Sequence, residues 1–106
     1  MMRALVNMPK AARAGDAVEI KIILSHPMET GYRMDDSGKP VPRNIVKELT
    51  CAYLGEEVFR VEMFPAISAN PYFSFFLMAD RSGPVILAWT DDRGESGRET
   101  LTLTVE

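Results

Sequence analysis

The sequence predicts an all-β fold, an immunoglobulin-like β-sandwich of about seven antiparallel strands. Short segments in which apolar and polar residues alternate recur along the chain, and turn residues separate nearly all of them. No segment has the apolar periodicity of a helix of ordinary length. At 106 residues, the chain is expected to form one sandwich domain over residues 1–106.

Two strands are expected in the first quarter of the chain. The apolar stretch from Arg3 to Met8 ends at Pro9, which is typical of an edge strand, and residues 10–16 are expected to form a polar bend. The next strand alternates regularly, as a half-buried strand does, with Ile23 as the one apolar residue on its polar side. Its inward positions are Val18, Ile20, Ile22 and Leu24.

A long polar loop over residues 26–43 follows, and a hairpin comes after it. The loop is much longer than a hairpin connection requires, and long ordered loops in compact domains are usually functional, so we expect recognition here. In the hairpin, a tight turn over residues 54–57 leads into a second strand over 58–63, and Lys47 is out of step in the first strand. The inward positions of that first strand are Ile45, Leu49, Cys51 and Tyr53.

Three strands are expected in the last third of the chain. Two prolines make residues 64–71 irregular. Residues 72–79 are almost continuously apolar, so both faces of this strand are expected to be covered. After a turn at residues 80–84 the next strand alternates inward, and a turn at residues 91–97 leads to the last strand, 99–105, where leucine and valine alternate with threonine. The inward positions of the strand between these two turns are Val85, Leu87 and Trp89.

The strand order predicts where the loops lie, because successive strands of such a sandwich run from one end to the other. The tight turns near Gly55 and Gly83 fall at one end. The loops 26–43, 64–71 and 91–97 all fall at the opposite end, so these three unusual loops are expected to be neighbours.

Composition excludes several classes of function. With a net charge of −3, the chain lacks the basic excess that binding to a phosphate backbone requires, so no nucleic-acid partner is expected. A single cysteine excludes an intrachain disulfide framework. The first nine residues are too short and interrupted for a signal peptide, and no apolar run reaches membrane-spanning length. By its own sequence the chain is expected to be soluble, unexported and not inserted in a membrane.

The residues that could carry chemistry are few. Cys51 falls on the inward side of its strand, so we expect an inert core thiol and not a reactive one. His26 and Met28 are soft donors that could suit Cu(I), but a third ligand is not apparent, and a loop histidine bonded to nearby backbone accounts for the pattern.

Carboxylates offer a second metal hypothesis of the same kind. If the end loops converge, they bring acidic residues together in a possible cation site, although turn-forming and solvated carboxylates also explain them. These residues are Glu29, Asp35, Asp36, Asp91 and Asp92. We expect no metal, no cofactor and no catalytic residue.

Four sequence blocks carry a resemblance to a known family. They are IILSHPMETG from residue 22, PRNIVKELTC from residue 42, PAISANPYFSF from residue 65 and WTDDRGE from residue 89. In this order and spacing they resemble SoxZ, the Z subunit of the sulfur-oxidation carrier, over nearly the whole chain. The resemblance implies an immunoglobulin-like sandwich, in agreement with the strand pattern.

The resemblance also implies a partner and a compartment. SoxZ subunits pair with SoxY, whose glycine-rich carboxy-terminal arm bears the cysteine that carries sulfur intermediates of thiosulfate oxidation. This chain ends in Leu103-Thr104-Val105-Glu106 with no such arm, so it is expected to be the non-catalytic scaffold half of a heterodimer or larger complex. Transient contact with other Sox enzymes and a periplasmic location, reached by export with the partner, are implied as well.

Topology and resemblance together predict a partner-binding site on the three end loops. The family-like blocks fall largely on these loops, which core packing alone does not require. The expected contact residues are His26, Met28, Glu29, Arg33, Ile67, Asn70, Tyr72 and Asp91. A purely structural interpretation stays open, in which prolines and glycines fix the turns while Ile67 and Tyr72 plug the end of the sandwich.

Two other functions also stay open from the sequence. One is a small immunoglobulin-like module that handles copper through His26 and Met28. The other is an enzyme-accessory binding domain, for which the fold alone is the argument.

Overall fold

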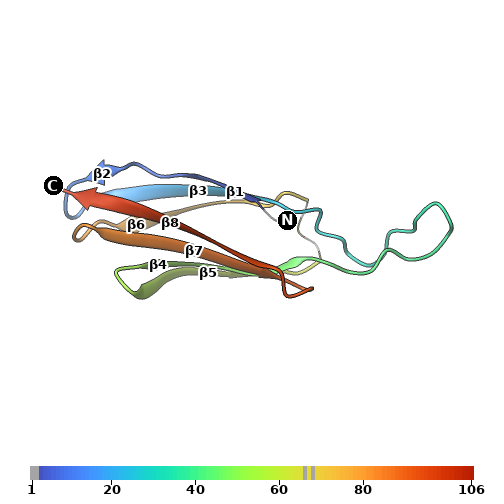
Figure 1. Cartoon of the computed structure of the whole chain (residues 1–106). Coiled ribbons are helices and arrows are strands. Elements are labelled where there is room, and N and C mark those ends of the chain that lie inside the picture. The colour runs from blue at the N-terminus through green and yellow to red at the C-terminus, as the bar shows by residue number, and fades with distance from the viewer. Residues whose placement is uncertain (1–2, 66, 68) are drawn as a thin grey trace.

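The computed structural model describes residues 3–65, 67 and 69–106, and these form eight strands in two sheets (Figure 1). The strands are β1 (Arg3–Asn7), β2 (Ala11–Ala12), β3 (Ala17–Ser25), β4 (Val46–Tyr53), β5 (Glu56–Glu62), β6 (Tyr72–Met78), β7 (Gly83–Asp91) and β8 (Ser96–Val105). One sheet has the order β1-β3-β6 and the other the order β2-β8-β7-β4-β5. The predicted all-β sandwich is confirmed, and the described residues include no helix that could span a membrane.

The extra strand is β2, which lies in the segment predicted to be only a polar bend. Ala11 and Ala12 pair in parallel with Thr104 and Val105 of β8. The backbone amide of Thr104 also donates to the carbonyl of Lys10 at 2.9 Å. Backbone hydrogen bonds form this strand without any apolar alternation, which is why the pattern did not reveal it. It covers the last two residues of β8 at one edge of the larger sheet.

The core lies between the two sheets, and the predicted inward positions of β3 are confirmed. Its four inward side chains are at most 2% exposed. They pack against buried residues of the opposite sheet, among them Leu49, Leu87 and Leu103, each with no exposed surface. Ile23, the apolar residue on the other side of β3, is 44% exposed.

A β-bulge explains why Lys47 is out of step in β4. The register between β4 and β7 shifts between Val46 and Glu48, so an extra residue is accommodated at this point. Ile45 and Val46 are therefore both fully buried although they are consecutive, and Lys47 is exposed. The bulge restores the inward alternation from Leu49 to Tyr53.

The expectation that both faces of β6 are covered is wrong. Phe75 and Leu77 are buried, and the Phe75 ring stacks on Phe59 of β5 with centroids 4.0 Å apart. On the opposite face Tyr72, Phe76 and Met78 are 55% to 64% exposed. The three-stranded sheet packs against the larger sheet on one side only, so among the described residues no second layer covers its outer face.

The predicted clustering of the loops is confirmed. The amide of Asn70 donates to the carbonyl of His26 at 2.8 Å, and that of Asp92 to Ile45 at 2.9 Å, which joins all three loops at one end. At the other end, a Cβ placed on Gly83 would collide with the Leu54 side chain, so the two tight turns are in contact. In Figure 1 the loop between β3 and β4 extends well beyond the strands, and we call residues 27–44 the projecting loop.

Candidate partner-binding site

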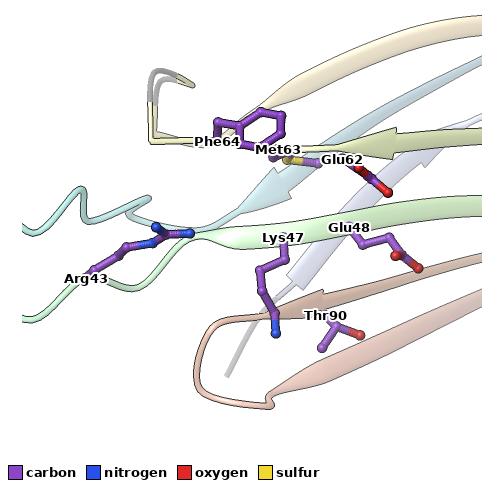
Figure 2. Close-up of a pocket in the computed structure, with 7 residues that line it drawn as sticks. All are labelled: Arg43, Lys47, Glu48, Glu62, Met63, Phe64 and Thr90. Atoms are coloured by element: carbon purple, nitrogen blue, oxygen red, sulfur yellow. The ribbon is translucent and has the colours of Figure 1, made fainter.

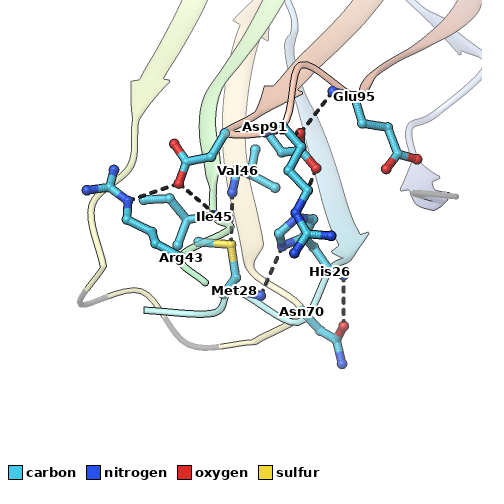
Figure 3. A network of polar contacts seen from close by, with 10 residues as sticks. His26, Met28, Arg43, Ile45, Val46, Asn70, Asp91 and Glu95 are labelled. Carbon is cyan, nitrogen blue, oxygen red and sulfur yellow. Dashed lines mark hydrogen bonds and ion pairs between the residues drawn. The ribbon is translucent and has the colours of Figure 1, made fainter. Parts of the chain in front are cut away.

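His26 is the centre of the loop end, where it follows the last residue of β3. Its ring is 4% exposed, and both ring nitrogens have partners (Figure 3). Nδ1 accepts a hydrogen bond of 2.9 Å from the backbone amide of Met28. Nε2 lies 3.3 Å from Oδ2 of Asp91. Because Nδ1 is the acceptor, the hydrogen-bond network assigns the proton of the neutral ring to Nε2, where it points at Asp91.

Asp91 is a fully buried carboxylate that accepts hydrogen bonds from the turn between β7 and β8. While Oδ2 faces His26, Oδ1 accepts hydrogen bonds of 2.9 Å from the amides of Arg93 and of Glu95. A buried carboxylate is stable only when its oxygens have such partners. Asp91 therefore holds the turn in shape and joins it to His26 and the end of β3.

Met28 fixes the start of the projecting loop to the core. Its side chain is 4% exposed, and its sulfur accepts a hydrogen bond of 3.3 Å from the amide of Val46. Its backbone has φ 52°, the left-handed region that a side chain other than glycine or asparagine seldom adopts. The contacts of the side chain and of its amide hold this conformation in place.

Asn70 joins the loop before β6 to the same centre. Its side-chain oxygen accepts from the amide of His26 at 3.1 Å, and its own amide donates to the carbonyl of His26. Asn70 also has a left-handed backbone, with φ 51°, and is exposed. The neighbouring Ala66 and Ser68 of the family-like block lie outside the described residues.

The structure thus brings together four of the eight predicted site residues in one hydrogen-bonded network. They are His26, Met28, Asn70 and Asp91, from all three loops. Three of the four are buried, so in the isolated chain they are positioned to shape the loops and not to touch another molecule directly. The histidine nitrogens and the methionine sulfur are already engaged, and the described residues contain no group of three His, Cys, Asp or Glu side chains that could hold a metal.

Glu29 and Arg33 form the base of the projecting loop. The Arg33 guanidinium donates to both carboxylate oxygens of Glu29, with a shortest distance of 2.6 Å. These hydrogen bonds lower the pKa of Glu29 and raise that of Arg33. Backbone pairing of Glu29 with Asn44 closes the loop at the same level. The paired side chains therefore lie at the surface on an ordered base.

The tip of the projecting loop is an ordered turn around Asp35. Its Oδ1 accepts from the amide and hydroxyl of Ser37 and from the amide of Lys39, and these bonds lower the pKa of Asp35. The tip also carries Tyr32 and Met34, which are 82% and 60% exposed. Sequence reasoning missed these two residues, although a large apolar side chain in a polar loop is a signal that could have found them.

Ile67 and Tyr72 lie in the third part of the predicted site. They line a shallow depression of about 330 Å³ together with Asn70. Ile67 is half-buried against the core, whereas Tyr72 begins β6 and is 55% exposed on the outer face of the sheet. Tyr72 therefore does not plug the end of the sandwich, as the structural interpretation supposed.

A second concave surface lies beside the base of the projecting loop (Figure 2). It has a volume of about 470 Å³ and is lined by Arg43, Lys47, Glu48, Glu62, Met63, Phe64 and Thr90. Arg43 is held by Asp92, whose Oδ2 accepts from its Nε at 2.9 Å. Phe64 is 65% exposed. This groove could not be predicted from the sequence, because its residues come from four separate segments.

Cys51 lies in the core of the sandwich and not at its surface. It has no exposed surface in the middle of β4, which confirms the predicted core position. Burial raises the pKa of the thiol to about 11, so the thiolate is scarce at neutral pH.

Comparisons with known proteins agree with this fold. A family model described as "Sulphur oxidation protein SoxZ" matches residues 6–102. None of the curated proteins matches the sequence. Among solved structures, a superoxide reductase (neelaredoxin) from Ignicoccus hospitalis is similar with a TM-score of 0.75 and 14% identity, over 97% of this chain and 80% of that one.

A second solved structure is the sulfur carrier protein SoxY from Chlorobium limicola f thiosulfatophilum. Its TM-score is 0.67 at 13% identity, over 97% of this chain and 78% of that one. At such identities these two likenesses show a shared fold and do not establish an activity.

Proposed function

Since the chain belongs to the SoxZ family of sulphur oxidation proteins, we propose that it is the non-catalytic scaffold subunit of a sulfur carrier and pairs with a SoxY-like chain. The family places the chain in the Sox sulfur-oxidation system. The proposal goes further, because it assigns the chemistry of sulfur transfer to the partner.

The single observation that carries this assignment is the state of Cys51. Covalent transport of sulfur needs an accessible thiolate, and the sequence contains one cysteine. That thiol is fully buried between the sheets, and its pKa is raised to about 11. This observation supports a carrier in which the cysteine that binds sulfur belongs to another chain, as the cysteine of a SoxY-like partner would.

The end loops are proposed to contribute to partner recognition in two ways. Glu29, Arg33 and Tyr72 present exposed or partly exposed groups, and Asn70 and Ile67 line the depression beside them. The buried members, His26, Met28 and Asp91, would hold these groups in position through the network described above. The complex would be a heterodimer or larger, would meet other Sox enzymes transiently, and would act in the periplasm, where SoxZ proteins generally act.

Substitution of Cys51 tests the scaffold role. We expect Cys51→Ala to support reconstituted thiosulfate oxidation at the wild-type rate when mixed with a SoxY-like partner and the Sox enzymes. The small cavity should lower the free energy of unfolding of this chain by about 1–2 kcal/mol. The rate of thiosulfate consumption and a thermal melt of the same preparation measure the two effects.

The control is the matching cysteine-to-alanine change in the carboxy-terminal arm of the partner, which should reduce the rate to background. If Cys51→Ala also reduced the rate to background while the complex stayed folded and assembled, the scaffold role would be wrong. Failure of the wild-type chain to bind any SoxY-like partner would count equally against it.

A further inference from the structure

The outer face of the three-stranded sheet is unusually apolar. Because β1, β3 and β6 are in register, Leu5, Ile23 and Tyr72 form one row across all three strands. Phe76 and Met78 continue the same face along β6. These five side chains are 44% to 70% exposed, and they make up more than half of the large exposed apolar residues in the described part of the chain. We call them the sheet-face cluster.

The opposite outer face of the molecule has a different character. On β8 its outward residues include Thr100, Thr102 and Thr104, and on β4 they include Glu48 and Thr50. A soluble β-sandwich normally carries polar residues on both outer faces. Apart from Val58 of β5, the exposed large apolar residues on strands all lie on β1, β3 and β6.

The polar residues of the same face form a narrow strip beside the row. Asn7, Lys21 and Ser74 lie in register on the three strands. Ser74 donates to Glu19 at 2.9 Å, and Lys21 lies 3.7 Å from the same carboxylate. The polar groups therefore lie between the apolar row and the two apolar residues further along β6, Phe76 and Met78. A mixture of exposed apolar side chains and fixed polar groups is the composition of a protein interface and not of a small-molecule pocket.

The face is large enough for a stable complex. β3 has nine residues, so the face is roughly 30 Å long and about 15 Å wide, or about 450 Å² in projection. Side-chain relief raises the accessible area towards the roughly 800 Å² per partner of a standard interface. Both outer strands, β1 and β6, are also sheet edges, so a partner could extend its contact over either side.

We propose that the sheet-face cluster is the main docking surface for a SoxY-like β-sandwich subunit. The inference rests on the proposed function, which requires such a partner. A SoxY structure shares the fold of this chain over 97% of its length, so a SoxY-like partner offers sheet faces of the same size and twist. Outside this face the exposed large apolar residues are Tyr32, Met34, Val58 and Phe64, which are spread over the projecting loop, β5 and the loop after it. If a second copy of this chain bound to the sheet-face cluster, the described residues would offer the SoxY-like partner no other apolar surface of this size.

Charge substitution on the face tests the proposal. Ile23→Lys and Phe76→Lys each place a cation in the sheet-face cluster, and both side chains are exposed, so the melting temperature of the isolated chain should change by no more than a few degrees. The dissociation constant for the purified SoxY-like subunit, measured by isothermal titration, should rise at least about 30-fold for each variant. The milder substitutions Phe76→Ser and Leu5→Ser should also weaken binding. They replace the lysine variants in the experiment if a lysine variant fails to fold.

Two matched controls share the introduced lysine. Thr102→Lys lies on the outer face of the larger sheet, and Phe64→Lys replaces a phenylalanine as exposed as Phe76, at 65% against 63%, but away from the face. Both should bind within about twofold of wild type. Hydrogen exchange on the wild-type complex should show new protection in β6 and β1.

Three results would overturn the proposal, and they differ in what else they affect. If Phe76→Lys bound normally while Phe64→Lys did not, the site would lie at the loop end and the scaffold function would stand. The isolated chain could instead form a dimer that the SoxY-like subunit does not dissociate. If Phe76→Lys dissociated that dimer, the occupant of the face would be a second copy of this chain. If wild type bound no SoxY-like subunit, the proposed function itself would fail.

Discussion

Individual residues at the loop end act through hydrogen bonds that leave little freedom to their side chains. His26 receives the Met28 amide on one ring nitrogen and faces Asp91 with the other. Because Nδ1 accepts from the Met28 amide, the ring donates to Asp91 through Nε2. These engagements also count against the copper-handling alternative, because a metal would have to displace existing partners of both His26 and Met28.

Removal of the imidazole should therefore destabilise the chain. His26→Ala leaves the buried Asp91 with one donor fewer and the Met28 amide without its acceptor, so we expect the free energy of unfolding to fall by about 2 kcal/mol. For a chain of this size the melting temperature should fall by roughly 10 °C. Lys47→Ala, an exposed change in neighbouring β4, is the control and should melt as wild type does. Equal melting temperatures for both variants would show that the network contributes nothing to stability.

Strands and turns could be predicted from the sequence where the alternation of apolar and polar side chains, or a turn residue, determines them. The regular alternation of β3 predicted its four buried residues, and the turn residues near Gly55 and Gly83 predicted the turn of the β4–β5 hairpin and the turn from β6 to β7 of the other sheet. The sequence missed β2, because its short ladder depends on backbone groups that no alternation marks. It predicted two covered faces for β6, because an apolar run has the same composition whether it is covered by the protein itself or left at a surface.

The candidate site was predictable in outline for a similar reason. Topology alone placed the three loops together, and four residues from them meet in one network. Burial of Met28 and Asp91 did not follow from loop composition, because it depends on where the bulge at Lys47 brings the start of β4. The sheet-face cluster did not follow either, because its residues lie on three strands that are separated in sequence.

The projecting loop should respond to pH through its carboxylates. The pKa values of Glu29 and Asp35 are lowered by their hydrogen bonds, so both groups stabilise the loop above their ordinary range and cease to do so as the pH falls through the lowered values. Protection factors of the Val41 and Asn44 amides, which donate across the loop, should fall about twofold to fivefold on acidification.

Arg33→Ala should reproduce this loss of protection at neutral pH, since it removes the partner of Glu29. Lys39→Ala takes one positive charge from the same loop and should leave the protection factors unchanged. If the two variants behaved alike, the ion pair at the base would not order the loop.

The whole molecule combines two unequal sheets with an extension at one end. In the larger sheet the short strand β2 pairs with the last residues of β8 and β5 is the other edge, whereas in the smaller sheet β1 and β6 are both edges and the outer face carries most of the exposed large apolar residues of the strands. Stability therefore depends mainly on the layer between the sheets, and the proposed surfaces for association lie on the smaller sheet and at the loop end. The radius of gyration is 16.1 Å, compared with about 13 Å for a compact chain of this length.

This shape has a hydrodynamic consequence for any study of the complex. The backbone extends 58 Å along one axis and 19 Å along each of the others, so the isolated chain should diffuse more slowly than a sphere of 11.8 kDa and elute early from a sizing column. Replacement of residues 31–42 by an Asn-Gly turn, which the pairing of Glu29 with Asn44 permits, should shift the elution later by more than the lost mass explains. An unchanged elution volume would show that the loop folds back in solution. Because a slim monomer can elute where a round dimer does, the number of subunits has to be counted by light scattering or sedimentation equilibrium, which report mass independently of shape.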